Sequence, residues 1–215
     1  MYWVASEACR SAAFFELLIN NVDYTAVPRD RTIVGECYSR RTRHSDAGGF
    51  VEVRFQHRDG NIKSGEFDAQ DYARARQCAL DTGRRAIFTH CLTEEFFAWA
   101  RAQGDCIVTV SQGSMPILFW QRESYFAGGD AEELSKRYRN TVKLIHQEKR
   151  AGDLHFMNHE FLFNENSHKL AIQIPEIDPK LAAHSIQNYV QDNLLMIKDW
   201  TTIDQALELT YKRIL

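Results

Sequence analysis

The stretch Gly48-Gly49-Phe50-Val51-Glu52-Val53-Arg54-Phe55 sets the first expectation for the fold. After the two glycines, apolar and charged residues alternate, so the valines fall on one face of an extended strand, and Glu52 and Arg54 fall on the other. Asp59-Gly60 follows shortly afterwards and is a strong signal for a tight hairpin turn. The pattern predicts a β-strand leading into a hairpin turn. Its charged face is either part of an active site or a solvated face with a cross-strand ion pair.

The surrounding sequence predicts helices and strands in alternation, because helix caps and short apolar runs follow one another along the chain. Asp68 and Thr93 each precede a stretch with helical periodicity. We expect helices at 7–20, 69–82 and 94–103, strands at 24–27, 32–38, 86–90 and 106–110, and a polar turn at 40–46. This order predicts the α/β (mixed α+β) class, with a central mixed β-sheet that contains the hairpin and is flanked by helices.

The second half of the chain reads as more helical. We expect a long polar helix at 130–150, a short strand at 169–174, and a helix at 179–194 that begins with a proline in its first turn. No linker rich in Gly, Ser or Pro separates the two halves. The sequence therefore predicts an α/β core at 1–127 and a helical extension at 128–215 that packs on this core.

Composition limits the classes of function. The chain has 215 residues, 44% of them hydrophobic, and a formal net charge of -3, so the whole molecule has no general attraction to nucleic acid or to anionic membranes. The five cysteines are scattered and lack Cys-x-x-Cys spacing, which disfavours a disulfide framework or a zinc knuckle. No secretory signal or membrane-length apolar run is visible. We expect a cytoplasmic protein with no membrane partner.

Residues 6–92 carry an acid before a helix, then strands, the pair Gly35-Glu36, and the run Phe50-Val51-Glu52-Val53. This order resembles the PD-(D/E)XK nuclease-like superfamily. The resemblance implies a nuclease-like domain that binds or cleaves nucleic acid with a divalent metal, Mg²⁺ or Mn²⁺. It also implies catalytic roles for four residues, which are Glu52, Arg54, Glu36 and Asp46.

The chemistry of that superfamily needs two carboxylates on a divalent metal, which polarises the phosphate and generates hydroxide from water. In this chain Glu52 and Asp46 are the candidate metal ligands. Two positions depart from the superfamily pattern, because Tyr38 stands where an aspartate is expected and Arg54 where a lysine is expected. An arginine stays protonated and cannot act as a base, so the site is either rearranged or catalytically degenerate.

Basic residues gather at two places. One group lies in the predicted polar turn, and a second lies along the predicted long helix, with aromatic residues nearby. Such groups can follow a phosphate backbone, although charge runs are often simply solvated faces. The candidate nucleic-acid contacts are Arg40, Arg41, Arg43, Lys136, Arg139 and Lys143.

Alternative functions start from other residues. The run that begins at Cys9 resembles the nucleophile helix of transglutaminase-like and papain-like enzymes, which implies a cysteine-dependent acyl-transfer or hydrolytic enzyme with His44 or His57 as partner. A third group, His155, His159 and His168, suits a metal if the first two share one helix face. A non-enzymatic interaction module that uses the C-terminal helices is the remaining alternative.

Overall fold

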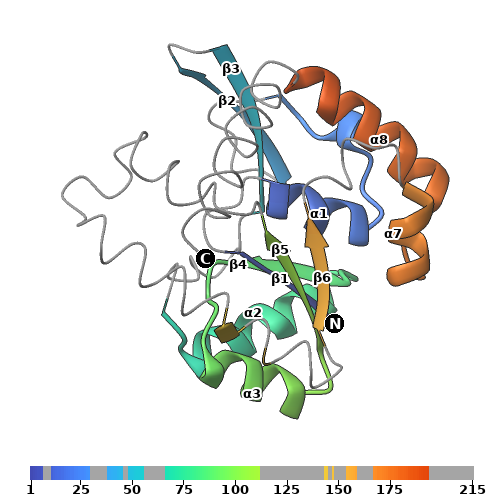
Figure 1. Ribbon diagram of the computed structural model, residues 1–215. Coiled ribbons are helices and arrows are strands. Elements are labelled where there is room, and N and C mark those ends of the chain that lie inside the picture. The colour runs from blue at the N-terminus through green and yellow to red at the C-terminus, as the bar shows by residue number, and fades with distance from the viewer. Residues whose placement is uncertain are drawn as a thin grey trace, which may run out of the picture.

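The computed structural model describes residues 1–6, 11–29, 38–45, 48–55, 66–111, 143–144, 147, 154–158 and 167–193. At its centre lies a four-stranded sheet with the strand order β4-β1-β5-β6, and every pairing in this sheet is parallel (Figure 1). The strands are β1 (Tyr2–Ala5), β4 (Ala86–Thr89), β5 (Cys106–Ser111) and β6 (Leu154–Asn158). The chain thus belongs to the predicted α/β class.

The first strand of the chain, β1, occupies an interior position of the sheet. Its residues pair with β4 on one side and with β5 on the other, so that Trp3 lies between Ile87 and Ile107. Trp3, Val4 and Ala5 are all fully buried. Burial on both faces is typical of strands in parallel sheets, whose apolar residues do not alternate with polar ones. The sequence reasoning did not predict this strand.

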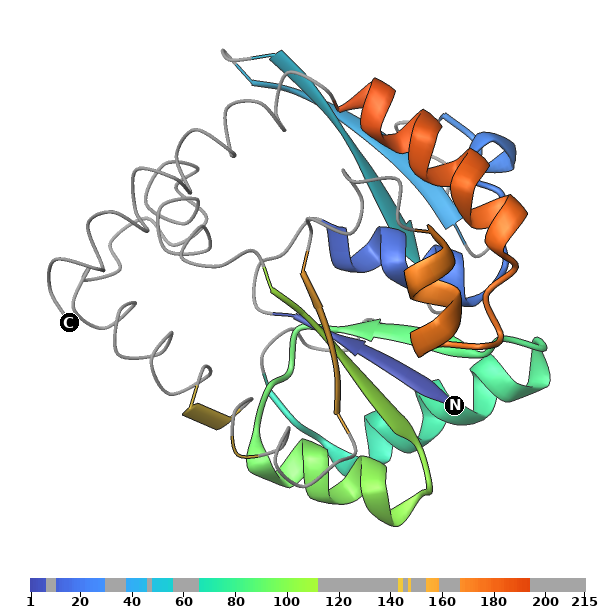
Figure 2. The ribbon, with the colours of Figure 1, turned by 45° about the vertical axis from the view of Figure 1, so that its right-hand side comes forward.

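Helices cover both faces of the sheet. The helices α2 (Ala69–Asp81) and α3 (Glu94–Ala102) lie on one face, and α1 (Ser11–Ile19), α7 (Ser167–Gln173) and α8 (Pro179–Asp192) lie toward the other (Figure 2). Asp68 and Thr93 cap α2 and α3, as predicted: their side chains accept hydrogen bonds from backbone N–H groups of the first turn.

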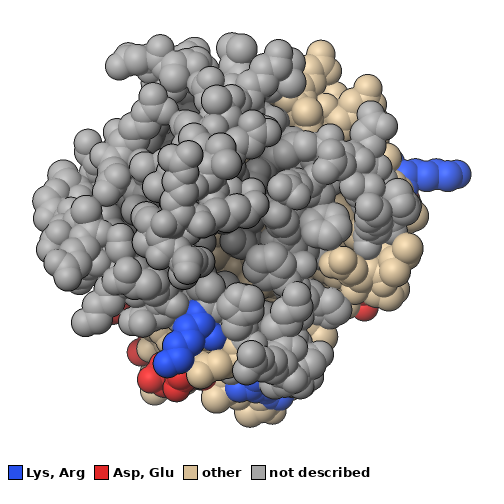
Figure 3. Space-filling model, viewed as in Figure 1, with Lys and Arg blue, Asp and Glu red and all other residues tan. Residues whose placement is uncertain are grey.

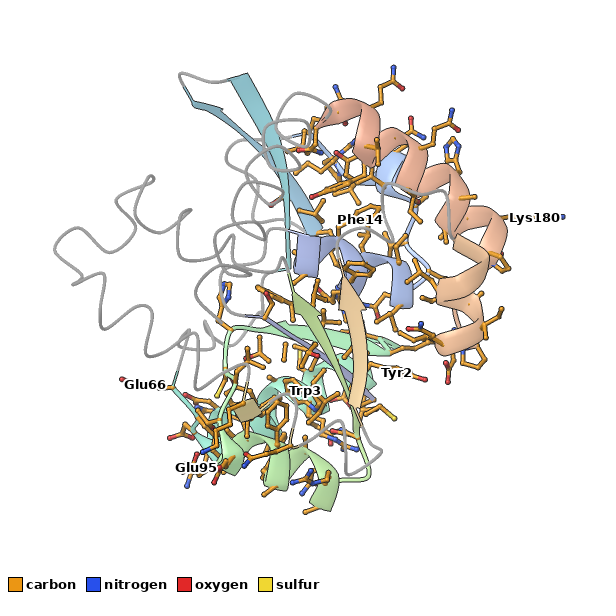
Figure 4. All side chains as sticks on the ribbon, in the orientation of Figure 1. Tyr2, Trp3, Phe14, Glu66, Glu95 and Lys180 are labelled. Carbon is orange, nitrogen blue, oxygen red and sulfur yellow. The ribbon has the colours of Figure 1, made fainter. Side chains whose placement is uncertain are left out.

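The two layers of helices enclose two apolar cores. Trp3 points toward α2 and α3, where its ring meets Tyr72, Phe96 and Trp99 at centroid distances of 5.3, 5.5 and 5.6 Å (Figure 4). Val4 belongs to the other core, which also holds Phe14 of α1. Neighbouring residues of β1 therefore serve opposite cores, as the alternation of a strand requires.

The strands β2 (Tyr38–Ser45) and β3 (Gly48–Phe55) form an antiparallel pair in a sheet of their own. The predicted polar turn at 40–46 is wrong over 40–45, because these residues form most of β2, and Asp46 lies outside the described residues. Among the described residues every pairing of the central sheet is parallel, and β2 and β3 form a sheet of their own, which corrects the expected mixed sheet. The predicted hairpin turn at Asp59-Gly60 lies outside the described residues. Figure 2 shows the hairpin extending away from the parallel sheet alongside α8.

Two further elements differ from the predictions. The expected strand at 24–27 is largely the 3₁₀ helix η1 (Tyr24–Ala26). Asp23 caps it, because the Asp23 carboxylate accepts a hydrogen bond from the backbone N–H of Thr25. The expected strand at 169–174 lies largely in α7. Alternation of apolar residues over so short a stretch fits one side of a helix as well as a strand.

The C-terminal elements pack on the N-terminal ones. Strand β6 extends the parallel sheet beside β5, and α8 contributes buried residues to the core that α1 forms. The hydroxyl of Tyr24 donates a hydrogen bond of 3.0 Å to Asp192, the last residue of α8. Within the described ranges, no helix is long and apolar enough to cross a membrane.

Candidate functional site

One face of the hairpin is anchored to the body of the protein. Val51 and Val53 of β3 are 9% and 1% exposed and belong to the core that α1 and α8 share. The backbone N–H of Val51 donates a buried hydrogen bond of 2.8 Å to the side-chain oxygen of Asn193, at the end of α8. This face has a structural role.

Arg40 lies on the same anchored face, because it is paired with Val53 across the hairpin. Its guanidinium donates to the carbonyl oxygens of Val27 and Thr25 at 2.6 and 3.2 Å, and it lies 4.6 Å from the ring centroid of Tyr24. The side chain is only 7% exposed. We predicted a phosphate contact for Arg40, and this burial argues against that role.

The opposite face of the hairpin carries the remaining predicted arginines. The register pairs Arg41 with Glu52, Arg43 with Phe50, and Ser39 with Arg54. Residues that face each other across a strand pair lie on the same side of the sheet, and successive residues alternate. Arg41, Arg43 and Arg54 therefore share one face, together with the single acid Glu52, and we call these four positions the arginine face.

Other predicted site residues are dispersed or lie outside the described ranges. Glu36, Asp46, Lys136, Arg139, Cys9, His57 and His159 lie outside them. Lys143 is exposed in a short helical stretch, and His44 is paired with Gly49 in the hairpin. Within the described part of the chain, no group of three or more His, Cys, Asp or Glu residues is arranged to hold a metal ion.

The predicted histidine pair does not form on a helix. His155 lies in β6, where it is paired with Val108, and His168 lies in α7. The prediction that His155 and His159 share a helix face is therefore wrong at His155, which lies in a strand.

Figure 3 shows the described Lys and Arg side chains on one face of the molecule. The visible described Lys and Arg side chains lie at the rim of this face, one beside α8 and others beside Asp and Glu side chains near α2 and α3. Figure 4 identifies the side chain that projects beside α8 as Lys180.

A second candidate site lies at the carboxyl edge of the parallel sheet and was not predicted. Every strand of this sheet ends in, or is followed by, a polar residue: Ser6, His90, Ser111 and Asn158. Open α/β sheets bind ligands outside the carboxyl ends of their strands, where neighbouring connections leave toward opposite faces. The sequence alone does not reveal this site, because the four polar residues come together only when all four segments are parallel strands of one sheet.

His90 is held in place at this edge. Its Nδ1 lies 2.9 Å from the carbonyl oxygen of Ser6, and its ring meets Phe88 edge-on at 4.6 Å between centroids. A carbonyl oxygen can only accept, so Nδ1 carries the hydrogen in this bond and Nε2 is the basic nitrogen of the neutral ring. Such an arrangement prepares a histidine to accept a proton.

Cys91, the next residue, does not supply a nucleophile in this state. Burial raises the pKa of its thiol, although a contact with the hydroxyl of Thr93 opposes the shift. The backbone N–H of Cys91 donates to the hydroxyl of Thr89 at 3.0 Å, which fixes the chain where it leaves β4. Cys91 therefore acts as a buried apolar residue beside the candidate edge site.

Comparisons with known proteins add no family to these observations. The chain matches no protein-family model, and neither the curated proteins nor the solved structures contain a significant match.

Proposed function

We propose that this protein binds nucleic acid through the arginine face of its hairpin. The observation that carries the proposal is the register of β2 and β3, which gathers Arg41, Arg43 and Arg54 on the face opposite the anchored valines. The net charge of the chain is -3, so binding depends on this local concentration of charge rather than on the molecule as a whole.

The shape of the hairpin suits such a ligand. Alternate residues of a strand lie roughly 7 Å apart, and the major groove of B-DNA, about 12 Å wide, admits a two-stranded β-ribbon. The planar guanidinium of an arginine donates two parallel hydrogen bonds to a phosphate, which a lysine cannot do. The register places Glu52 opposite Arg41, and its negative charge reduces the local positive charge by one.

Cleavage of the bound strand is the next step of the same proposal. In this step Glu52 and Asp46 would hold Mg²⁺ or Mn²⁺, as the resemblance to the nuclease-like superfamily implies, and the metal would supply polarisation of the phosphate. Arg54 stabilises the developing negative charge and does not remove a proton. A cleavage assay with each metal, on the wild type and on Glu52→Ala, tests this step. Cleavage that survives in Glu52→Ala contradicts this catalytic step. Binding without any cleavage would mean that the protein binds nucleic acid but does not cleave it.

Binding is tested by fluorescence anisotropy with labelled single- and double-stranded oligonucleotides across a salt series. We expect Arg41→Gln/Arg43→Gln to weaken binding and to reduce the slope of log K against log salt by about 1 per arginine. The matched control is Arg74→Gln/Arg101→Gln, which removes the same charge from α2 and α3. Equal losses in both double variants contradict a role for the arginine face.

The carboxyl edge supports a second candidate function, the binding of a small polar molecule with proton transfer by His90. The hydrogen bond between His90 Nδ1 and the Ser6 carbonyl favours it, because that bond leaves Nε2 as the proton acceptor. Thermal-shift measurements with nucleoside phosphates and small carboxylic acids test this function in wild type and His90→Gln. The control is His184→Gln on the exposed side of α8. A ligand that stabilises His90→Gln as much as wild type contradicts it.

The described cysteines, Cys78, Cys91 and Cys106, are free thiols. Their state supports action in a reducing compartment, and the cytoplasm is the location that we propose.

A further inference from the structure

A buried carboxyl group lies where the hairpin meets the parallel sheet. Glu16 of α1 has no solvent exposure, and its Oε1 accepts hydrogen bonds from the hydroxyl of Tyr38 at 3.2 Å and from Nδ2 of Asn20 at 3.3 Å. Nη1 of Arg84 lies 3.9 Å from the same oxygen, beyond hydrogen-bonding distance. The second oxygen, Oε2, is buried and has no hydrogen-bond partner in the described part of the chain.

This cluster connects three segments that are far apart in the sequence. Tyr38 is the first residue of β2, and Arg84 lies between α2 and β4 with its guanidinium 4.7 Å from the centroid of the Tyr38 ring. Asn20 also accepts hydrogen bonds from the backbone N–H groups of Arg85 and Ala86, at 2.8 and 2.9 Å. The base of the hairpin is thereby attached to α1 and to the start of β4 through polar contacts around one carboxyl group.

The protonation state of Glu16 is set by its burial. Burial raises the pKa of Glu16 to about 8, and the opposing influences are the positive charge of Arg84 and the hydrogen bond from Tyr38. These two are the charged or titratable groups that face Glu16 among the described residues, one from the α2–β4 connection and one from β2. Burial also lowers the pKa of Arg84 and raises that of Tyr38, so each group is less easily ionised here than in water.

We propose that Glu16 is a proton-dependent anchor for the hairpin: its neutral carboxyl group holds the start of β2 against α1 and β4, and loss of the proton opens this junction to water. The physical reason is the unsatisfied Oε2. A neutral acid needs few partners, whereas a carboxylate needs several donors and is poorly stabilised in a site that supplies two hydrogen bonds. Opening the junction lets water complete the solvation of the charge.

The expected pH dependence follows from the sign of the shift. In the open state the carboxyl group titrates near its ordinary value of 4.5, and in the closed state near 8. The closed junction is therefore fully favoured below pH 4.5. Its opening constant rises by about tenfold per pH unit between these two values, and it levels off above the higher one. The anchor does not depend on what the hairpin binds.

Hydrogen exchange of the amides of β2 and β3 between pH 5 and 9, corrected for intrinsic exchange rates, tests the anchor. We expect the opening constant of β2 near Tyr38 to rise with pH in the wild type and to be flat in Glu16→Gln. The amides of α3, which contributes no residue to the junction, serve as the internal control. A flat wild-type profile, or an equal rise in Glu16→Gln, overturns the proposal.

A second measurement keeps the proposal falsifiable if Glu16→Gln does not fold. The side-chain ¹³Cδ signal of Glu16 in the wild-type protein reports its protonation directly. A midpoint well above the ordinary value, accompanied by shifts of Tyr38 and Asn20 signals in the same range, supports the anchor. A midpoint near 4.5 in the folded protein overturns it, because the closed state then holds a charged carboxylate at neutral pH.

Discussion

Phe14 of α1 stacks on Tyr189 of α8, with ring centroids 4.1 Å apart and planes inclined by 18°. Both side chains are almost completely buried, and Tyr24 packs edge-on against each of them. This aromatic contact joins a helix from the first twenty residues to one that begins at Pro179. It lies directly beside the anchored face of the hairpin, so the position of the hairpin depends on it.

We expect Phe14→Ala to lower the free energy of unfolding by about 3–5 kcal/mol, because it removes a buried ring and leaves a cavity between α1 and α8. Phe14→Leu fills part of the cavity and costs less. Ile172→Ala on α7 removes an apolar side chain that is 77% exposed, so we expect a change of about 0.5 kcal/mol or less. Urea denaturation measures all three. A cost for Phe14→Ala as small as that of the control contradicts a role in joining the helices.

Asp105 provides a second test of a buried contact. Its carboxylate accepts a hydrogen bond of 2.9 Å from the indole of Trp3, and Arg76 donates to both of its oxygens at 2.8 and 2.9 Å. The Asp105 side chain is 1% exposed, so we expect Asp105→Asn to cost about 3 kcal/mol by leaving Arg76 without its charged partner.

The matched control for Asp105 is Asp71→Asn, which removes an exposed pair with Arg74 on α2. Exposed ion pairs contribute about 0–1 kcal/mol, so this change is expected to be small. Unfolding in denaturant at pH 7 compares the two substitutions. Similar losses of stability for both substitutions would mean that the contacts of Asp105 with Trp3 and Arg76 do not stabilise the folded protein.

Local signals predicted helix starts and two of the four strands of the parallel sheet, because the expected strands at 86–90 and 106–110 are β4 and β5. They did not predict β1 or how the strands pair. Asp68 and Thr93 marked two helix starts correctly because a cap acts within three residues of its own position. Strand β1 has only four residues, and Tyr2–Ala5 becomes recognisable as a strand only through its two parallel neighbours. Pairing between segments more than eighty residues apart leaves no local pattern.

The candidate site, too, was predicted where local sequence decides and missed where tertiary contacts decide. Arginine-rich sequence around Arg41 suggested a turn because charged residues are rarely found on a buried strand. The structure resolves the conflict by burying Arg40 against the carbonyl oxygens of Val27 and Thr25, while the register places Arg41 and Arg43 on the other face. The charge was visible in the sequence, but its division between two faces depends on tertiary contacts.

Arg40 and Arg41 are neighbours with opposite expected phenotypes. Arg40→Met removes hydrogen bonds to two carbonyl oxygens and an ion pair of 3.8 Å with Asp192, so we expect a loss of about 2–3 kcal/mol in stability. Arg41→Met is expected to leave stability within about 0.5 kcal/mol and to weaken nucleic-acid binding. Denaturation and anisotropy on both variants test this separation. The reversed pattern would contradict the assignment of nucleic-acid binding to the arginine face.

The pH dependence of global stability gives an independent measure of Glu16. Its pKa is raised from 4.5 to about 8 by burial, so its stabilising contribution is fully present below pH 4.5 and is lost as the pH rises through 8. One proton changes the free energy of unfolding by up to about 1.4 kcal/mol per pH unit in this window. The difference between wild type and Glu16→Gln, measured in urea from pH 4 to 9, cancels the titration of the other groups. We expect the wild type to lose stability relative to the variant as the pH rises. Parallel curves would contradict the raised pKa of Glu16, because Glu16 would then bind the same number of protons in the folded and the unfolded chain.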